Sequence, residues 1–153
     1  MTIHIQLPER EQHRPTKHRP RLLAIVATLA EGERQAALFR EAFLVRVAST
    51  LAEGRTALGE WQPQVVTLDT TGYPDGPVWP LIDDLIHSPC YPRVALCIIS
   101  DETRVQSKVA AFRAGADHYI VRSLAAPRQV AALRAAWWYV QAGRPSWKEE
   151  TRP

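Results

Sequence analysis

The sequence is poor in the residues that build covalent or metal-based scaffolds. Its 153 residues include two cysteines, Cys90 and Cys97, which lie in or beside an apolar run and show no CxxC spacing. We therefore expect neither a disulfide framework nor a cysteine metal site, and we expect a cytoplasmic protein.

Long apolar segments are also missing. No apolar run approaches the ~20 residues that a membrane-spanning helix needs, and residues 1–20 lack the apolar stretch and small-residue cleavage site of a secretory signal.

The length of the chain suits one domain with a single sizeable core. A hydrophobic content of 46% and a charged content of 23% are ordinary for a globular protein.

The excess of positive charge is confined to the N-terminus. Residues 1–21 hold five Lys and Arg against two Glu, and this difference of three equals the formal net charge of +3. The rest of the chain is balanced, unlike the broad basic face of a dedicated nucleic-acid binder. We interpret residues 1–20 as a flexible basic arm. It is either a solvated tail or an arm that contacts phosphate or a partner.

Apolar runs alternate with amphipathic segments along residues 21–142. The runs predict strands at 22–28, 64–69, 93–100 and 118–122, and the alternating apolar and polar residues of 44–49 predict a strand nearer a sheet edge. The amphipathic segments predict helices at 31–43, 51–61, 80–88, 102–117 and 126–143. Strands that alternate with helices indicate an α/β fold, a (βα)5 doubly wound five-stranded parallel sheet. Residues 143–153 are then a C-terminal tail.

Two of the predicted helices have further signals. Thr28 and Glu31 have the spacing of a capping box at the start of the first helix. In the segment 102–117, Val105, Val109 and Phe112 share one helix face, and Gly115 is a typical helix stop.

Polar side chains end three of the predicted strands. Asp69, Ser100 and Arg122 end the third, fourth and fifth strands. The carboxyl ends of parallel strands share one edge of the sheet, so a carboxylate, a hydroxyl and a cation should meet there. Such a set suits a phosphoryl group, which the carboxylate can accept, the hydroxyl can hydrogen-bond and the cation can neutralise.

Three stretches give the chain a family likeness. With "PQVVTLDTTGYPDG" (63–76), "VALCIIS" (94–100) and "AFRAGADHYIVR" (111–122), it resembles the CheY-like receiver domain of two-component response regulators over residues 21–142. The resemblance implies a flavodoxin-like topology. It also implies that Asp69 is the phosphoacceptor position, that Ser100 and Tyr119 are the phosphoryl-contact and switch residues, and that Arg122 stands where the family usually has Lys.

The first departure from the family concerns metal binding. Family members end the first strand with adjacent acids that hold Mg²⁺ together with the phosphoacceptor, whereas residues 24–30 here contain no acid. Mg²⁺ prefers several hard oxygens in near-octahedral geometry. Glu31 or Glu33 could substitute only if the register of the loop differs. We therefore expect no metal and no other cofactor.

The second departure is Arg122-Ser123 in place of the usual Lys-Pro pair. An arginine presents a planar fork instead of a compact ammonium, so the replacement is not conservative at a tight site. A standing ion pair between Arg122 and Asp69 would hold the site in one state.

We therefore expect an atypical receiver, or pseudo-receiver, that is not an enzyme. It would act in signal transduction through contact with a protein partner, such as a histidine kinase or an output or transcription regulator. One alternative is a functional single-domain response regulator, phosphorylated on Asp69 by a histidine kinase in a phosphorelay. A second is a nucleic-acid-associated regulator that uses the basic arm.

Aromatic residues mark candidate interfaces. Trp138 and Tyr139 lie off the apolar stripe of the last helix, so at least one of them should be partly exposed. The resemblance implies a homodimer or partner face there, and the alternative is packing of Trp138 against the C-terminal tail, including Trp147. Trp79, in a proline-rich loop after Asp69, is a second candidate contact.

Overall fold

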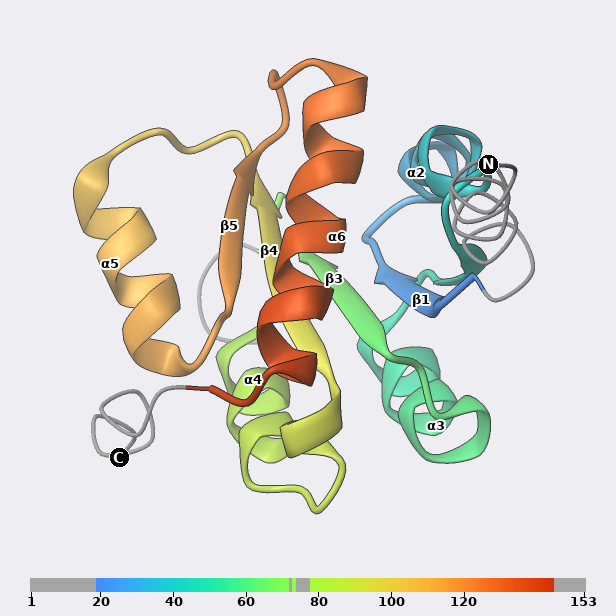
Figure 1. Cartoon of the computed structure of the whole chain (residues 1–153). Helices are drawn as coiled ribbons and strands as arrows, with labels where there is room; N and C mark the ends of the chain where they lie inside the picture. Colours follow the sequence, from blue (N-terminus) through green and yellow to red (C-terminus); the bar gives the residue numbers. More distant parts are fainter. Residues whose placement is uncertain (1–18, 72, 74–77, 145–153) are drawn as a thin grey trace, which may run out of the picture.

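The five predicted strands form one parallel sheet in the order β2-β1-β3-β4-β5 (Figure 1). The computed structural model describes residues 19–71, 73 and 78–144. The predicted (βα)5 doubly wound fold is confirmed. The strands are β1 (Arg21–Ile25), β2 (Leu44–Ala48), β3 (Val65–Asp69), β4 (Ala95–Ser100) and β5 (His118–Val121).

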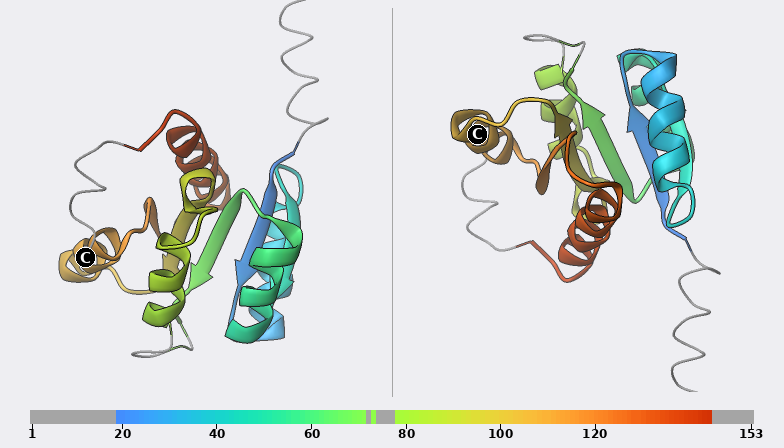
Figure 2. Two further views of the ribbon diagram at one scale, coloured as in Figure 1. Left: turned by 90° about the horizontal axis from the view of Figure 1, so that it is seen from below. Right: turned by 90° about the horizontal axis from the view of Figure 1, so that it is seen from above.

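Helices cover both faces of the sheet (Figure 2). One face is covered by α2 (Leu29–Phe39) and α6 (Ala126–Gln141). The other is covered by α3 (Leu51–Trp61), α4 (Val78–Ile86) and α5 (Val105–Ala114), and a short 3₁₀ helix, η1 (Tyr91–Arg93), leads into β4. This distribution of helices over the two faces is what right-handed crossovers on a sheet that grows in both directions produce.

The central strands explain the continuous apolar runs of the sequence. Every side chain of β3 and β4 is buried, because helices cover both faces of these strands. Each fully buried Leu or Ile contributes about 1.5–3 kcal/mol to folding. Two polar residues, Thr67 and Asp69, lie within the buried strand β3, and both need hydrogen-bond partners there.

The start of α2 differs from the prediction by two residues. Thr28 is the N-cap, and its Oγ1 accepts a hydrogen bond from the N–H of Glu31 at 3.2 Å. The helix therefore begins at Leu29 rather than at residue 31. The carboxylate of Glu31 accepts hydrogen bonds from Arg34, Gln35 and Arg122, so this side chain belongs to the site described below.

The apolar face of α5 is turned to the solvent. The structure confirms the helix and its stop at Gly115, but Val105, Val109 and Phe112 are exposed. The reason is that α5 contacts the sheet through small side chains, the buried Ala111 and the partly buried Ala114.

The two terminal segments lie largely outside the described residues. Of the predicted basic arm, the structure describes Arg19 and Pro20, and an Nη1 of Arg19 donates to the carbonyl oxygen of Arg40 at 2.6 Å. Of the predicted C-terminal tail it describes Gly143 and Arg144. The Pro74-Asp75-Gly76 turn and Trp147 are also outside. Within the described ranges, no helix is long and apolar enough to cross a membrane.

Candidate functional site

The site lies at the carboxyl ends of the three strands β3, β4 and β5. Asp69 is the last residue of β3, Ser100 is the last residue of β4, and Arg122 directly follows β5. Because the strands are parallel, these ends share one edge of the sheet. The register agrees, since Asp69 is paired with Ile99, the neighbour of Ser100, and Ser100 is paired with Val121, the neighbour of Arg122.

Asp69 and Arg122 form a direct ion pair. Nη2 of Arg122 lies 2.5 Å from Oδ1 of Asp69, whose side chain is 1% exposed. The same oxygen accepts the backbone N–H of Thr71 at 2.9 Å, and the other oxygen, Oδ2, accepts Nε2 of Gln35 at 3.2 Å. Both oxygens of this buried carboxylate therefore have donors, and one donor carries a full charge.

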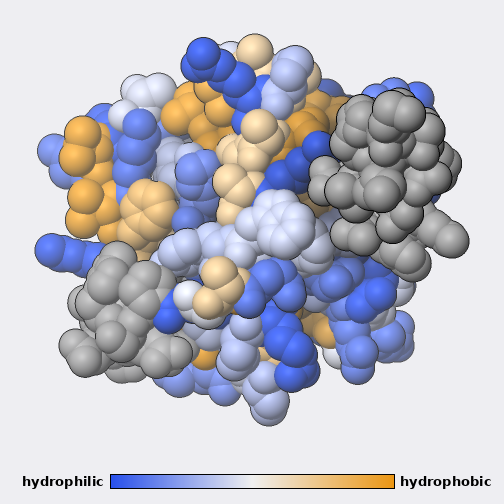
Figure 3. Space-filling view, in the orientation of Figure 1, coloured by the Kyte–Doolittle hydropathy of each residue, from blue (hydrophilic) through white to orange (hydrophobic). Residues whose placement is uncertain are grey.

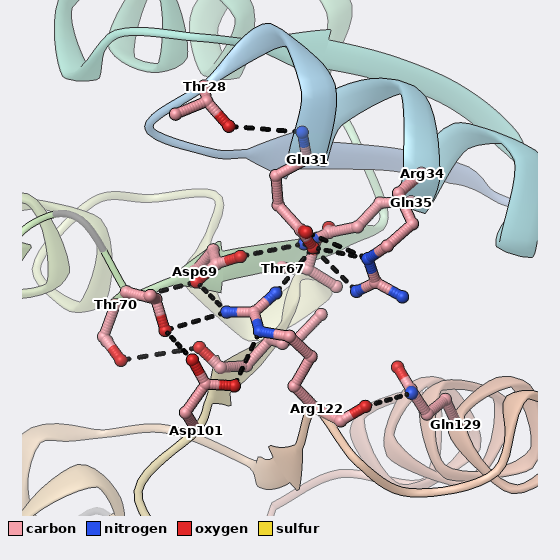
Figure 4. Close-up of polar contacts among 12 residues, drawn as sticks. Thr28, Glu31, Arg34, Gln35, Thr67, Asp69, Thr70, Asp101, Arg122 and Gln129 are labelled. Atoms are coloured by element: carbon pink, nitrogen blue, oxygen red, sulfur yellow. Dashed lines mark hydrogen bonds and ion pairs between the residues drawn. The ribbon is translucent and has the colours of Figure 1, made fainter.

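Arg122 binds three carboxylates at once (Figure 4). Besides Asp69, its Nη1 lies 2.5 Å from Oε2 of Glu31, and its Nε lies 2.9 Å from Oδ1 of Asp101. Nη2 also donates to Oγ1 of Thr71 at 2.8 Å. The hydrogen bond to Asp69 and the neighbouring carboxylates raise the pKa of Arg122 further, against the effect of burial, so the guanidinium remains charged.

Glu31 reaches the site from the first turn of α2. Burial raises its pKa, but Arg34, Gln35 and Arg122 together outweigh burial, and the net pKa lies below its ordinary value. Glu31 is thus held in its charged form. The sequence suggested Glu31 as a capping-box residue and as a replacement metal ligand, and in the structure its Oε2 accepts from Arg122 and Gln35.

A buried amide connects α2 to β3. The side chain of Gln35 is fully buried, and its Nε2 donates both to Oδ2 of Asp69 and to Oε2 of Glu31, the latter at 2.9 Å. The hydroxyl of Thr67 donates to Oε1 of Gln35 at 3.4 Å. Sequence reasoning missed Gln35. The signal that could have revealed it is a polar residue on the helix face that packs on an apolar strand.

Tyr73 forms a hydrogen bond to the backbone just beyond the end of β1. The phenol of Tyr73 donates to the carbonyl oxygen of Val26 at 2.7 Å. Burial and the charges of Asp69 and Glu53 raise the pKa of Tyr73, so the phenol keeps its proton. A backbone oxygen that a metal could use in this region is thereby already bonded.

The donors around Asp69 do not fit Mg²⁺. Residues 24–30 contain no acid, and the carboxylates nearest Asp69 are bonded to Arg122, Arg34 and Gln35. In the part of the chain that the structure describes, no group of three or more His, Cys, Asp or Glu residues could hold a metal ion. Mg²⁺ would need several free hard oxygens at this place.

Ser100 and Tyr119 meet at the β4–α5 loop, away from the guanidinium. Oγ of Ser100 accepts the N–H of Glu102 at 3.0 Å, and the hydroxyl of Tyr119 donates to the carbonyl oxygen of Glu102 at 2.8 Å. Tyr119 is half-buried against the core. The structure therefore joins Asp69 to Arg122, while Ser100 and Tyr119 are joined to Glu102. Ser100 still touches Arg122 through the backbone, since its carbonyl oxygen accepts the N–H of Arg122 at 2.9 Å.

The aromatic interface candidates differ in exposure. Trp138 is 64% exposed and Trp79 is 40% exposed, whereas Tyr139 is half-buried and packs against the core. The ring of Trp138 lies beside the ring of Trp137, with centroids 5.0 Å apart. Trp138 is therefore the candidate that the last helix presents to solvent.

The last helix also contacts the site. Nε2 of the buried Gln129 donates to the carbonyl oxygens of Arg122 at 3.0 Å and of Leu124 at 2.7 Å. These bonds hold the segment that carries Arg122 against α6.

Comparisons with known proteins agree with this fold. No protein-family model matches the chain, and no curated protein matches its sequence. Solved receiver domains do match its structure. A signal receiver domain from Vibrio parahaemolyticus superposes with a TM-score of 0.71 at 16% identity, covering 82% of this chain and 95% of that one. A CheY-like response regulator receiver domain from Methanospirillum hungatei gives 0.69 at 17% identity, covering 82% and 98%.

A response regulator from Thermotoga maritima gives a TM-score of 0.70 at 15% identity, covering 79% of this chain and 99% of that one. At these identities the likeness establishes the fold, and the chain has the fold of receiver domains.

Proposed function

We propose that the chain is an atypical receiver-like signalling module whose phosphoacceptor position is held in a permanent ion pair. The observation that carries this proposal is the guanidinium of Arg122, which binds Asp69 while it also binds Glu31 and Asp101. In this reading Arg122 supplies, from the chain itself, the positive charge that a metal ion would otherwise bring to Asp69.

Phosphoryl transfer to Asp69 is disfavoured for two physical reasons. An attacking carboxylate oxygen must donate a lone pair, and the three hydrogen bonds to Asp69, one of them from a guanidinium, lower the nucleophilicity of both of its oxygens. A metal ion normally neutralises the charge between an anionic phosphate and an anionic acceptor, and the donors present do not fit one. Removing the guanidinium to free Asp69 would leave a buried carboxylate unpaired, at a cost of about 3–5 kcal/mol.

We propose that the module has no enzymatic activity and acts in the cytoplasm by contact with a protein partner. By analogy with the receiver domains whose fold it shares, we propose a histidine kinase or an output or transcription regulator as the class of partner. Two exposed tryptophans, Trp79 and Trp138, support this proposal, because exposed aromatic side chains are enriched at protein interfaces.

The phosphorylation state provides the direct test. The full chain is incubated with acetyl phosphate and Mg²⁺, and its intact mass is measured beside that of Asp69→Asn. We expect no added phosphoryl mass on either protein. A stable adduct on the wild type that is lost in Asp69→Asn would overturn the proposal in favour of a working response regulator.

A further inference from the structure

Two adjoining cavities lie far from Asp69, at the opposite edge of the sheet. The larger, of about 470 Å³, is bordered by Arg21, the first residue of β1, and by Gln64 and Val94, which directly precede β3 and β4. Its volume falls within the ~300–1,000 Å³ of small-molecule sites. The smaller, of about 240 Å³, lies between α3 and α4. The two cavities adjoin, because both are lined by Leu58, Gly59 and Cys90.

The larger cavity has positive charge and no counter-charge of its own. Its described lining holds two arginines, Arg21 and Arg93, and no Asp or Glu. Neither arginine takes part in an ion pair formed by the described residues. Nε and Nη2 of Arg21 donate to carbonyl oxygens at the end of α3, whereas its Nη1 donates to no residue that the structure describes. A guanidinium that is held in place and keeps a donor available suits an anion.

The smaller cavity is mainly apolar. It is lined by Leu58 of α3 and by the buried Leu81 and Leu85 of α4. The two charged residues of its described lining, Arg55 and Asp84, form an ion pair with each other that joins α3 to α4. Figure 3 shows a mainly hydrophilic surface over these helices, at the bottom of the view, with small apolar areas (Figure 1). The leucines thus form a recessed apolar lining with no unpaired charge among its described residues.

We propose that the two cavities together bind a small amphiphilic anion, a carboxylate or a phosphate monoester with an aliphatic tail. Charge complementarity orients the ligand. Its head group lies beside Arg21 and Arg93, since a guanidinium binds both kinds of anion, and its tail lies between α3 and α4. The reverse orientation would place the anion among leucines, where its desolvation is costly. The proposal goes beyond the proposed function, because this site is separate from Asp69 and independent of phosphorylation.

Cys90 can report on occupancy of the site. It is partly exposed and lines both cavities, whereas Cys97 is fully buried. Iodoacetamide, which is uncharged, should therefore alkylate the native full chain at Cys90 and spare Cys97. Intact mass counts the labels, and Cys90→Ser identifies the labelled thiol. A ligand that spans the two cavities must pass Cys90, so it should slow this alkylation several-fold.

Five probes separate the roles of head group and tail. Octanoate and octyl phosphate have both parts, octanol and octylamine have the tail without a negative charge, and acetate has the charge without the tail. Each is titrated into the full chain while amide chemical shifts and the alkylation of Cys90 are followed. At least one of the two amphiphilic anions should bind saturably, with shifts centred on the cavity linings, and the stronger binder identifies the head group. The other three probes should bind at least about tenfold more weakly, since each lacks one part.

A side chain added at Gly59 should block the site. Arg55, Leu58, Gly59 and Gln62 have the spacing i, i+3, i+4 and i+7, so they share the face of α3 that borders the cavities. Beyond the neighbouring backbone of the helix, a Cβ at Gly59 would meet no atom within 4 Å. Gly59→Leu should therefore fold and abolish the shifts caused by the anion. Ala135→Leu, at an exposed position of α6 that lines neither cavity, is the control and should leave binding unchanged.

A charge-neutralising pair tests the head-group end. Arg93 is exposed and makes no ion pair with a described residue, so Arg93→Gln should fold normally. It should weaken binding of the amphiphilic anion about two- to fivefold, as expected for a partly exposed charge pair. Arg113→Gln makes the same change in net charge at an exposed position of α5, outside both cavities, and should leave binding unchanged.

Four outcomes would overturn the proposal. They are no saturable binding of either amphiphilic anion, equal binding of octanol and octanoate, binding that Gly59→Leu leaves as intact as Ala135→Leu does, and shifts centred outside the cavity linings. A Cys90 that iodoacetamide does not reach in the native chain would also count against the proposal, because the cavities would then be closed to ligands.

Discussion

At the scale of single residues, the identity of Arg122 decides what the site can do. A lysine ammonium is a compact point charge, whereas a guanidinium presents separate donors in a fixed plane. Three different nitrogens of Arg122 each contact a different carboxylate, those of Glu31, Asp69 and Asp101. A lysine at this position could neutralise Asp69 but could not hold all three acids in this arrangement.

Replacing Arg122 should therefore be costly. Arg122→Met leaves the buried Asp69 without its cation, and we expect it to lower the free energy of unfolding by about 3–5 kcal/mol in urea denaturation. Combining it with Asp69→Asn should cost clearly less than the sum of the two single changes, because the pair is coupled. Arg134→Met, at an exposed position of α6, is the control and should shift stability by less than about 0.5 kcal/mol. If the losses in unfolding free energy of Arg122→Met and Asp69→Asn simply added up in the double variant, this would contradict a standing ion pair between the two residues.

At the scale of elements, short local signals place the site residues. The Thr28 cap begins α2 at Leu29, and this start puts Glu31 and Gln35 one turn apart. Gln35 then reaches Asp69 of β3, and Glu31 reaches Arg122. On the other face, the end of α5 is set by Gly115, which adopts a φ of 120°. That conformation suits glycine because other residues meet steric hindrance from their Cβ.

Two glycine substitutions should have opposite effects on stability. A Cβ at Gly115 would lie 2.6 Å from Cγ2 of Ile86, in a backbone conformation unfavourable to alanine. We expect Gly115→Ala to lower the free energy of unfolding by at least about 1 kcal/mol. Gly59 lies within α3, and beyond the neighbouring backbone of its own helix no atom lies within 4 Å of such a Cβ, so Gly59→Ala should raise stability by about 0.5–1 kcal/mol. Urea denaturation of both variants measures the contrast, and a stabilised Gly115→Ala would show that this end of α5 is not constrained.

At the scale of the whole molecule, the sequence predicted the scaffold better than the site. Continuous apolar runs require a sheet covered on both faces, and strand-end positions follow from that, which is why Asp69 and Arg122 could be placed together. Glu31 and Arg122 are 91 positions apart in the chain, and their contact depends on how α2 packs, which local periodicity does not encode. The exposed face of α5 was unpredictable for the same reason, since alanines and not valines meet the sheet.

A second ion pair at the other end of the sheet also escaped prediction, because Arg144 follows the last predicted helix in a polar stretch. Arg144 is bidentate to Asp117, at 2.7 and 2.9 Å, and it donates to the carbonyl oxygens of Tyr91 and Val94. Its guanidinium lies 3.7 Å from the centroid of the Tyr91 ring. Asp117 also accepts the N–H of Leu96 at the start of β4. The end of α6 is thus tied to β4 and to the loop before β5.

Breaking this pair should destabilise the whole fold without altering the site at Asp69. The side chain of Arg144 is 4% exposed and that of Asp117 is fully buried, so Asp117→Asn leaves a buried guanidinium without its counter-ion and should cost about 3–5 kcal/mol. Asp117→Asn combined with Arg144→Met should recover part of that loss, which urea denaturation can measure. Chemical shifts around Asp69 should stay unchanged in both variants under native conditions. A loss below about 1 kcal/mol would mean that the Asp117–Arg144 pair contributes no more than a surface ion pair, and that the other contacts of Arg144, to the carbonyl oxygens of Tyr91 and Val94, hold the end of α6.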